Sequence, residues 1–181
     1  ALISPLAPLS GGMVELAEIL SANFKKDGHQ VNRVQLGSGL AGIFPIPYLY
    51  IHILKAIIKS EIIHIISASG NALWLKDLPT VILARLFQKR IILHFVGGKA
   101  IEQFKNWIWI KFLPFKYTDL IVVPTKIMRD ALAVRKGVSN IQIIPHIVNT
   151  EMFRKDLEYT EDKNPILFSA KALELLASSA S

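Results

Sequence analysis

The sequence predicts a doubly wound α/β fold, in which a parallel sheet is covered by helices on both faces. Short, continuous apolar runs alternate along the chain with longer segments of helical periodicity. Strands that are apolar throughout are typical of parallel sheets, because both of their faces are buried. The 181 residues are 51% hydrophobic and their mean hydropathy is +0.39, so the chain can bury a large core.

The chain opens with an apolar run, a loop broken by prolines, and Ser10-Gly11-Gly12 before a helical stripe from Met13 to about Lys26. Ser10 can cap this helix, and glycines at its positive end let backbone N–H groups approach a bound anion. Ligands of α/β sheets gather at such strand-to-helix turns. Gly11 and Gly12 are therefore candidate binding residues, and a plain turn is the alternative interpretation.

The remaining elements follow from apolar runs, helical stripes and their punctuation. Further strands are expected at residues 31–36, 62–66, 91–95, 120–123 and 141–144, and further helices at 47–59, 71–88, 99–113 and 126–136. Gly28 and Gly137 are placed to end the helices before them. Pro47 suits a first helical turn, Pro79 predicts a break, and Pro114 is expected to stop the helix at 99–113.

The end of the chain has a different composition. Residues 1–155 are expected to form one N-terminal domain, and the acidic, polar stretch 156–164 to be a linker. Residues 165–181 predict one strand and one weak helix, which cannot form a core alone. They are expected to be the start of a truncated second domain or a tail.

The composition limits the chemistry that the chain can perform. Its formal net charge of +7 favours anionic partners. It has no cysteine, which excludes disulfides, thiolate catalysis and cysteine-type zinc sites and fits a reducing, cytoplasmic location. No uninterrupted apolar run reaches the roughly 18–20 residues of a spanning helix, and the start lacks the basic segment of a signal peptide.

One glycine pattern is a poor match to a cofactor site. Gly37, Gly39 and Gly42 spell the G-x-G-x-x-G of dinucleotide sites, but they follow the second expected strand rather than the first. Pro45 and Pro47 lie where the helix of that motif would run. We therefore expect a flexible loop here and no nicotinamide or flavin cofactor.

The five histidines show no metal-ligand spacing, so no metal site is expected. His52 and His64 lie among apolar residues and are expected to be hydrogen-bonded core or rim residues. His94 differs, because it ends a buried strand at the carboxyl edge of the sheet, just before Gly97 and Gly98. It is a candidate functional residue, with a structural role as the alternative.

Residues 99–117 are rich in both lysine and aromatic side chains, which is typical of a membrane interface. The candidate membrane contacts are Lys105, Trp107, Trp109, Lys111 and Phe112. A core-facing helix with solvated lysines is the main alternative. Single-stranded RNA could also use such residues, but no RNA-binding signature accompanies them.

Several motifs in order resemble a known family. They are Ser10-Gly11-Gly12-Met13, Gly28-His29-Gln30-Val31, Ile62-Ile63-His64-Ile65, Thr118-Asp119 through Thr125, Gly137-Val138, Ile143-Ile144-Pro145, Val148-Asn149 and Phe153. Over about residues 1–168 this arrangement resembles the N-terminal domain of the retaining GT-B glycosyltransferases of family 4. Two departures are Val96, where that family often has a second histidine, and His146-Ile147 in place of its common Asn-Gly.

The resemblance implies a Rossmann-like, acceptor-binding half of a GT-B fold that faces a second domain holding most of a nucleotide-sugar. The implied substrate-binding residues are Gly11, Gly12, Gly97, Gly98 and Thr125, and the implied catalytic residue is His94. The whole enzyme would transfer a sugar to an acceptor at the membrane surface, such as a lipid-linked glycan. This chain alone is expected to be inactive without the second domain.

The expected partners follow from the same resemblance: a nucleotide-sugar, a glycan or lipid-linked acceptor, an anionic membrane surface and a C-terminal donor-binding domain. No cofactor, metal or nucleic acid is expected. The implied location is cytoplasmic, with peripheral attachment to the inner face of the membrane. The alternative function is a non-catalytic membrane-surface module or the partner subunit of a two-chain sugar transferase.

Overall fold

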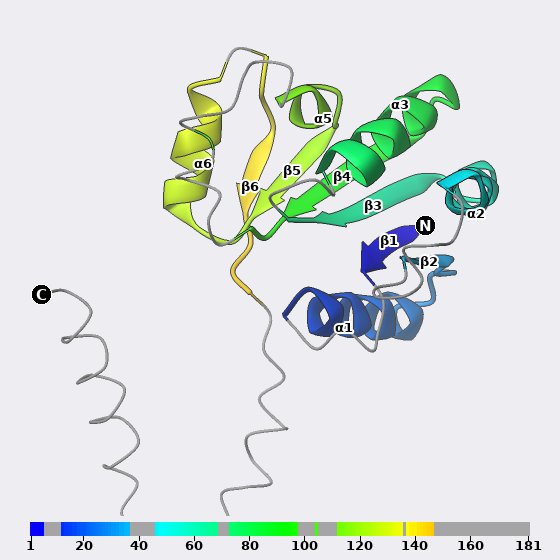
Figure 1. Cartoon of the computed structure of the whole chain (residues 1–181). Helices are drawn as coiled ribbons and strands as arrows, with labels where there is room; N and C mark the ends of the chain where they lie inside the picture. The colour runs from blue at the N-terminus through cyan, green and yellow to red at the C-terminus, as the bar shows by residue number, and fades with distance from the viewer. Residues whose placement is uncertain are drawn as a thin grey trace, which may run out of the picture. The chain divides into compact units, whose positions relative to one another are not determined.

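The computed structural model describes most of the first 146 residues. The described residues are 1–5, 12–36, 46–68, 73–97, 104, 112–135 and 137–146. They belong to one compact unit, Ala1–Val148 (Figure 1). The expected linker at 156–164 and the expected second-domain start at 165–181 lie outside the described residues, so the proposed domain boundaries stay predictions.

A single parallel sheet forms the centre of this unit. Its strands are β1 (Leu2–Pro5), β2 (Arg33–Leu36), β3 (Ile62–Ser67), β4 (Arg90–Phe95), β5 (Leu120–Val123) and β6 (Ile141–Ile143). The six strands lie in the order β2-β1-β3-β4-β5-β6, and every neighbouring pair is parallel. The predicted fold class is confirmed: this is a Rossmann-like, doubly wound α/β sheet.

The helices lie on both faces of the sheet. They are α1 (Gly12–Lys26), α2 (Ile46–Ile58), the π-helix η2 (Leu73–Asp77), α3 (Leu78–Leu86), α5 (Leu113–Lys116) and α6 (Lys126–Ala133). Figure 1 shows α1 on one side of the sheet and α3, α5 and α6 on the other. Helix α2 packs against α3. None of the described helices combines the length and apolar character needed to cross a bilayer.

Alternating residues of the strands point to opposite faces of the sheet, and each face has its own hydrophobic core. Ile63 and Ile65 of β3 join Phe95 and the inner faces of α2, α3 and α6 in the larger core. On the opposite face, Ile66 of β3 joins Leu2 and the α1 side chains in a smaller core. Both cores exclude water from the sheet, which is why its strands are mainly apolar.

Helix α1 ends as the sequence predicts. Gly28 has a φ of +85°, and its N–H donates to the carbonyl of Lys25 at 3.1 Å. The N–H of His29 donates to the carbonyl of Phe24 at 2.9 Å. These two bonds form a Schellman motif, in which a left-handed residue satisfies the last helical carbonyls.

Two proline positions and one helix end can be compared with the expectations. The segment expected to be helical at 71–88 with a break near Pro79 contains η2 followed directly by α3, so the helix type changes close to Pro79, which lies in the first turn of α3. Pro114 lies in the first turn of α5, and most of the helix expected at 99–113 lies outside the described residues. Proline suits this position, because the first helical N–H groups have no intrahelical acceptor. Helix α6 ends at Ala133, before the expected residue 136.

Candidate functional site

The described candidate residues lie at the carboxyl edge of the sheet. Gly12 begins α1 after β1, His94 is the penultimate residue of β4, Gly97 follows β4, and Thr125 follows β5. Parallel strands end at the same edge, so the topology brings these residues to one side of the molecule. The candidates Gly11 and Gly98 lie outside the described residues.

Two helices begin at this edge. Gly12 is exposed, and a Cβ added to it would meet no atom within 4 Å. Thr125 has extended backbone angles, and its Oγ1 accepts a hydrogen bond from the backbone N–H of Met128 at 3.3 Å. Thr125 therefore caps α6. Both helix N-termini carry partial positive charge toward this edge.

A stacked pair of histidines lies beneath α1. His64 of β3 and His94 of β4 have ring centroids 5.7 Å apart and an interplanar angle of 23°. They are 8% and 3% exposed. The Nε2 atom of each has no hydrogen-bond partner in the part of the chain that the structure describes. His64 is a core residue, as the sequence predicts. The sequence also predicts that it is hydrogen-bonded, and its Nε2 atom has no partner among the described residues.

Burial keeps both imidazoles neutral. It lowers the pKa of His94 to about 4, with a smaller contribution from the nearby charge of His146. It lowers the pKa of His64 to about 3, and His94 and the amino group of Ala1 lower it further. A neutral imidazole nitrogen either accepts or donates one hydrogen bond. Because an unpaired buried nitrogen costs about 1–3 kcal/mol, a polar ligand group that reached Nε2 of His94 would be stabilised.

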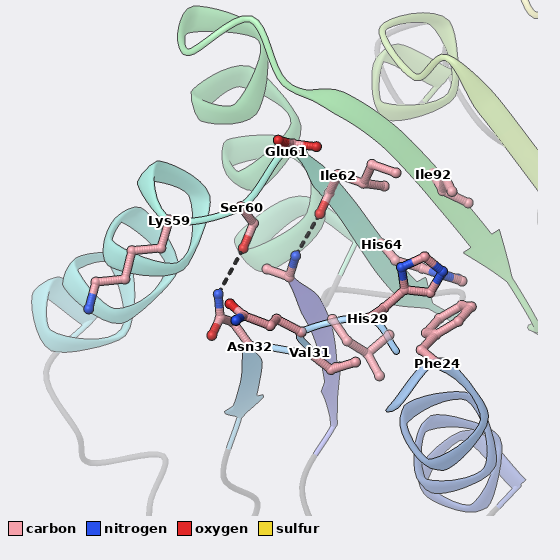
Figure 2. A pocket seen from close by; sticks show the side chains of 13 residues that line it. Phe24, His29, Val31, Asn32, Lys59, Ser60, Glu61, Ile62, His64 and Ile92 are labelled. Atoms are coloured by element: carbon pink, nitrogen blue, oxygen red, sulfur yellow. Dashed lines mark hydrogen bonds between the residues drawn. The ribbon is translucent and has the colours of Figure 1, made fainter. Parts of the chain in front are cut away.

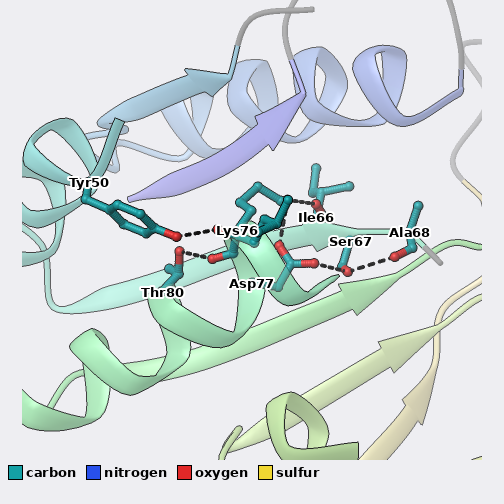
Figure 3. A network of polar contacts seen from close by, with 8 residues as sticks. Tyr50, Ile66, Ser67, Ala68, Lys76, Asp77 and Thr80 are labelled. Carbon is teal, nitrogen blue, oxygen red and sulfur yellow. Dashed lines mark hydrogen bonds and ion pairs between the residues drawn. The ribbon is translucent and has the colours of Figure 1, made fainter. Parts of the chain in front are cut away.

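A second buried polar cluster lies at the end of β3 (Figure 3). Lys76 of η2 donates to the backbone carbonyl of Ile66 at 2.9 Å and forms a 2.7 Å ion pair with Asp77. Ser67 donates a short hydrogen bond to the other carboxylate oxygen of Asp77. Burial raises the pKa of Asp77, while Lys76 and then Ser67 oppose that rise. Through these interactions, Lys76 and Asp77 hold the π-helix η2 against Ile66 and Ser67, the last residues of β3.

The Ser67–Lys76–Asp77 cluster has a positioning role rather than a chemical one. Its polar side chains pair with one another and with the backbone carbonyl of Ile66, which holds η2 against β3. Sequence reasoning missed the cluster. Its signal was a Lys-Asp pair inside a mainly apolar helical segment at 73–84, where a charged pair needs a buried partner or a solvated face.

A cavity of about 460 Å³ lies away from the candidate residues. It lies at the amino ends of β1 and β3, where Ala1, Glu61 and Ile62 line it (Figure 2). Its inner wall includes His64 and Phe24, whose rings are 6.1 Å apart. Ligands of open α/β sheets bind at the opposite, carboxyl edge. We therefore do not assign this cavity to the candidate site.

The structure corrects one predicted membrane contact. Phe112 is 6% exposed and packs in the core with Phe104 and Phe115. The guanidinium of Arg135 lies 4.9 Å from the centre of its ring. A side chain held in this way cannot enter a lipid surface. The other predicted contacts lie outside the described residues: Lys105, Trp107, Trp109 and Lys111.

The described residues contain no group of three histidine, aspartate or glutamate side chains that could hold a metal ion. No protein-family model matches the chain, and a search of curated proteins found no relative. Its function therefore has to be argued from the geometry of the site.

Proposed function

We propose that this chain is the acceptor-binding half of a retaining glycosyltransferase, which transfers a sugar from a nucleoside-diphosphate sugar to a lipid-linked glycan. The proposal is supported by the motif resemblance to family 4 and by a Rossmann-like sheet with the expected element order. The donor-binding domain of such an enzyme would be a separate part. The site described above would then bind the acceptor and meet the donor phosphates.

The observation that carries the proposal is the environment of His94. It lies at the carboxyl edge of β4, it is buried, and its Nε2 is unpartnered among the described residues. The lowered pKa means that the imidazole is neutral at pH 7. A neutral imidazole at this edge can hydrogen-bond a sugar hydroxyl and orient it.

The helix N-termini support the second part of the proposal. Helix α1 begins at Gly12, where the open space allows close approach of a ligand to the backbone. Helix α6 begins after Thr125 at the same edge. In a transferase, backbone N–H groups at such positions stabilise the negative charge that develops on a leaving diphosphate.

Acceptor binding tests the proposal directly. The probe is a short-chain polyprenyl diphosphate that carries one sugar, titrated into the chain and followed by calorimetry. We expect His94→Gln to weaken binding by about threefold to tenfold, because one hydrogen bond is lost or misplaced. The matched control, His29→Gln, changes an exposed histidine and should bind like the wild type. Absence of binding by the wild type, or equal binding by both variants, would overturn the proposal.

Turnover gives an independent test. The chain is incubated with nucleoside-diphosphate sugars, and free nucleotide is measured. We expect no release above the rate without protein, because the residues that would hold the donor belong to another domain. Release at enzyme-like rates would contradict the assignment of this chain as the acceptor half.

A further inference from the structure

The outer side of α3 and η2 is apolar. Leu75 of η2 is 63% exposed, and Ile82 and Leu86 of α3 are 47% and 73% exposed. Leu75 is exposed on η2, which directly precedes α3. Ile82 and Leu86 are four residues apart, so they lie on one side of α3. Its opposite side buries Val81 and Ala84 in the core. A helical segment that is apolar on both sides is expected to be covered on both sides.

Helix α2 repeats this arrangement. Ile51 and Ile58 are 49% and 54% exposed and lie seven residues apart on the helix surface. Ile53 and Ile57 of the same helix are fully buried. Because α2 packs against α3 on one face of the sheet, the two outer stripes belong to the same layer of helices. We name the five exposed residues the α2–α3 face: Ile51, Ile58, Leu75, Ile82 and Leu86.

The charges beside the α2–α3 face are mainly positive. Lys55 and Lys59 lie on and just after α2, and Lys89 and Arg90 follow α3. The Nζ atom of Lys89 lies 3.5 Å from the carbonyl oxygen of Ile58, which places a cation where the two helices end. This arrangement surrounds exposed aliphatic side chains with basic groups.

Few carboxylates offset these cations. In the described segments 46–61 and 73–90, the acidic residues are Glu61, which is exposed, and Asp77, which is fully buried and paired. Asp119, from a later segment, pairs with the exposed Arg85 of α3 at 2.7 Å. Lys55, Lys59, Lys89 and Arg90 then stand against Glu61 alone, so the surface beside the face has a positive excess. This pattern of apolar anchors with basic neighbours is the one that interfacial helices use on anionic lipids.

We propose that the α2–α3 face docks on an anionic lipid bilayer, with its aliphatic side chains among the acyl chains and its lysines at the headgroups. A second copy of the chain is a poor occupant, because each copy carries a net charge of +7 and the same basic residues would face one another. A protein partner would have to offer a large apolar surface with an acidic border. A bilayer that contains anionic lipid supplies both features at once.

The inference goes beyond the proposed function by assigning a surface that contacts lipid. Bilayer binding depends on exposure and charge alone and is measured without sugar transfer. Failure of acceptor binding and failure of docking are therefore separate results.

Vesicle flotation tests the proposal with the full 181-residue chain. The vesicles contain phosphatidylcholine alone or with phosphatidylglycerol. We expect the wild type to bind the anionic vesicles and to release as salt rises. The double variant Ile82→Gln/Leu86→Gln should lose about tenfold or more in affinity, because two apolar anchors are removed. Glutamine favours helix, so folding should be kept and is checked by circular dichroism.

A matched control is available on α6. Ile127 and Val134 are 65% and 78% exposed, so Ile127→Gln/Val134→Gln also removes two exposed apolar side chains and leaves the α2–α3 face unchanged. This helix carries the acidic residue Asp130, which would disfavour contact with anionic lipid. This control should bind like the wild type. Lys55→Gln should weaken binding about fivefold on anionic vesicles, since one lysine near the surface contributes about 1 kcal/mol.

Three results would overturn the proposal. The first is absence of wild-type binding to anionic vesicles at low salt. The second is equal loss in the α3 and α6 double variants, which would mean that no particular face binds. The third is a wild-type dimer that becomes monomeric in Ile82→Gln/Leu86→Gln, which would assign the face to a second copy of the chain.

Discussion

Strand β3 separates two buried polar clusters that are built in different ways. On one face, Ser67 joins Lys76 and Asp77 in an ion pair with added hydrogen bonds. On the other face, His64 stacks on His94 of β4, and neither Nε2 atom has a partner in the described parts of the chain. In the first cluster, Lys76 and Ser67 oppose the rise that burial causes in the pKa of Asp77. In the second, burial lowers the pKa of both imidazoles.

The difference indicates separate roles. A buried ion pair with hydrogen bonds leaves little capacity for a ligand and holds two elements in register. An unpartnered buried nitrogen costs stability, and a bound ligand, ion or water is one way in which such a group is satisfied. The paired cluster is therefore structural, and the histidine pair is the better candidate for function.

The largest effect is expected when the paired cluster is broken. Asp77→Ala leaves the ammonium of Lys76 buried without its counter-charge. Breaking a buried pair in this way costs about 3–5 kcal/mol. Urea unfolding followed by circular dichroism should show this loss in the free energy of unfolding.

A double variant sharpens the same comparison. Lys76→Met/Asp77→Leu removes both charges and fills the space with apolar side chains, so it should be more stable than Asp77→Ala. A double variant that is less stable than the single one would show that the ion pair itself, and not the uncompensated charge, supplies the stability. The structural role would then need another explanation.

The histidine pair predicts acid sensitivity. The folded pKa values of about 4 for His94 and about 3 for His64 lie below the unfolded value of about 6.5. The unfolded chain therefore binds more protons between these values, and stability falls as the pH is lowered through this window. Each imidazole contributes a slope of about 1.4 kcal/mol per pH unit.

Urea unfolding at pH 7, 6 and 5 measures this slope. His64→Phe keeps an aromatic ring beside His94 but cannot bind a proton, so its stability should fall less steeply than that of the wild type. The exposed His29 offers a control, and His29→Gln should keep the wild-type slope. If His64→Phe and the wild type lose stability in parallel, the histidine pair is not the acid-sensitive element.

The sheet could be predicted from the sequence because its strands are buried on both faces. The apolar runs at 91–95 and 120–123 become β4 and β5 almost as expected. Turn chemistry was equally informative at Gly28, where only the left-handed conformation completes the cap. Proline was less informative, because it both starts and stops helices, and Pro114 starts one.

The site was predictable only in part. The position of His94 at the edge follows from the strand pattern. Its contact with His64 does not, because it depends on β3 and β4 being neighbours in the register that pairs Ile66 with His94. Lys76 and Asp77 look like surface residues in the sequence, and only the fold places them against the end of β3.

The smallest effect concerns α1, which covers the histidine pair. Gly12→Ala places a methyl group where no atom lies within 4 Å, so the fold should tolerate it or gain up to about 1 kcal/mol. Gly28→Ala is the matched variant at the other end of α1. It meets open space too, but its φ of +85° is strained for alanine, and a loss of about 1 kcal/mol is expected. Thermal unfolding compares the two.

If Gly12→Ala keeps its stability but weakens binding of the polyprenyl diphosphate probe, the glycine is retained for ligand approach at the helix N-terminus. If it loses stability as Gly28→Ala does, its role is conformational, and α1 contributes to function only by covering His64 and His94.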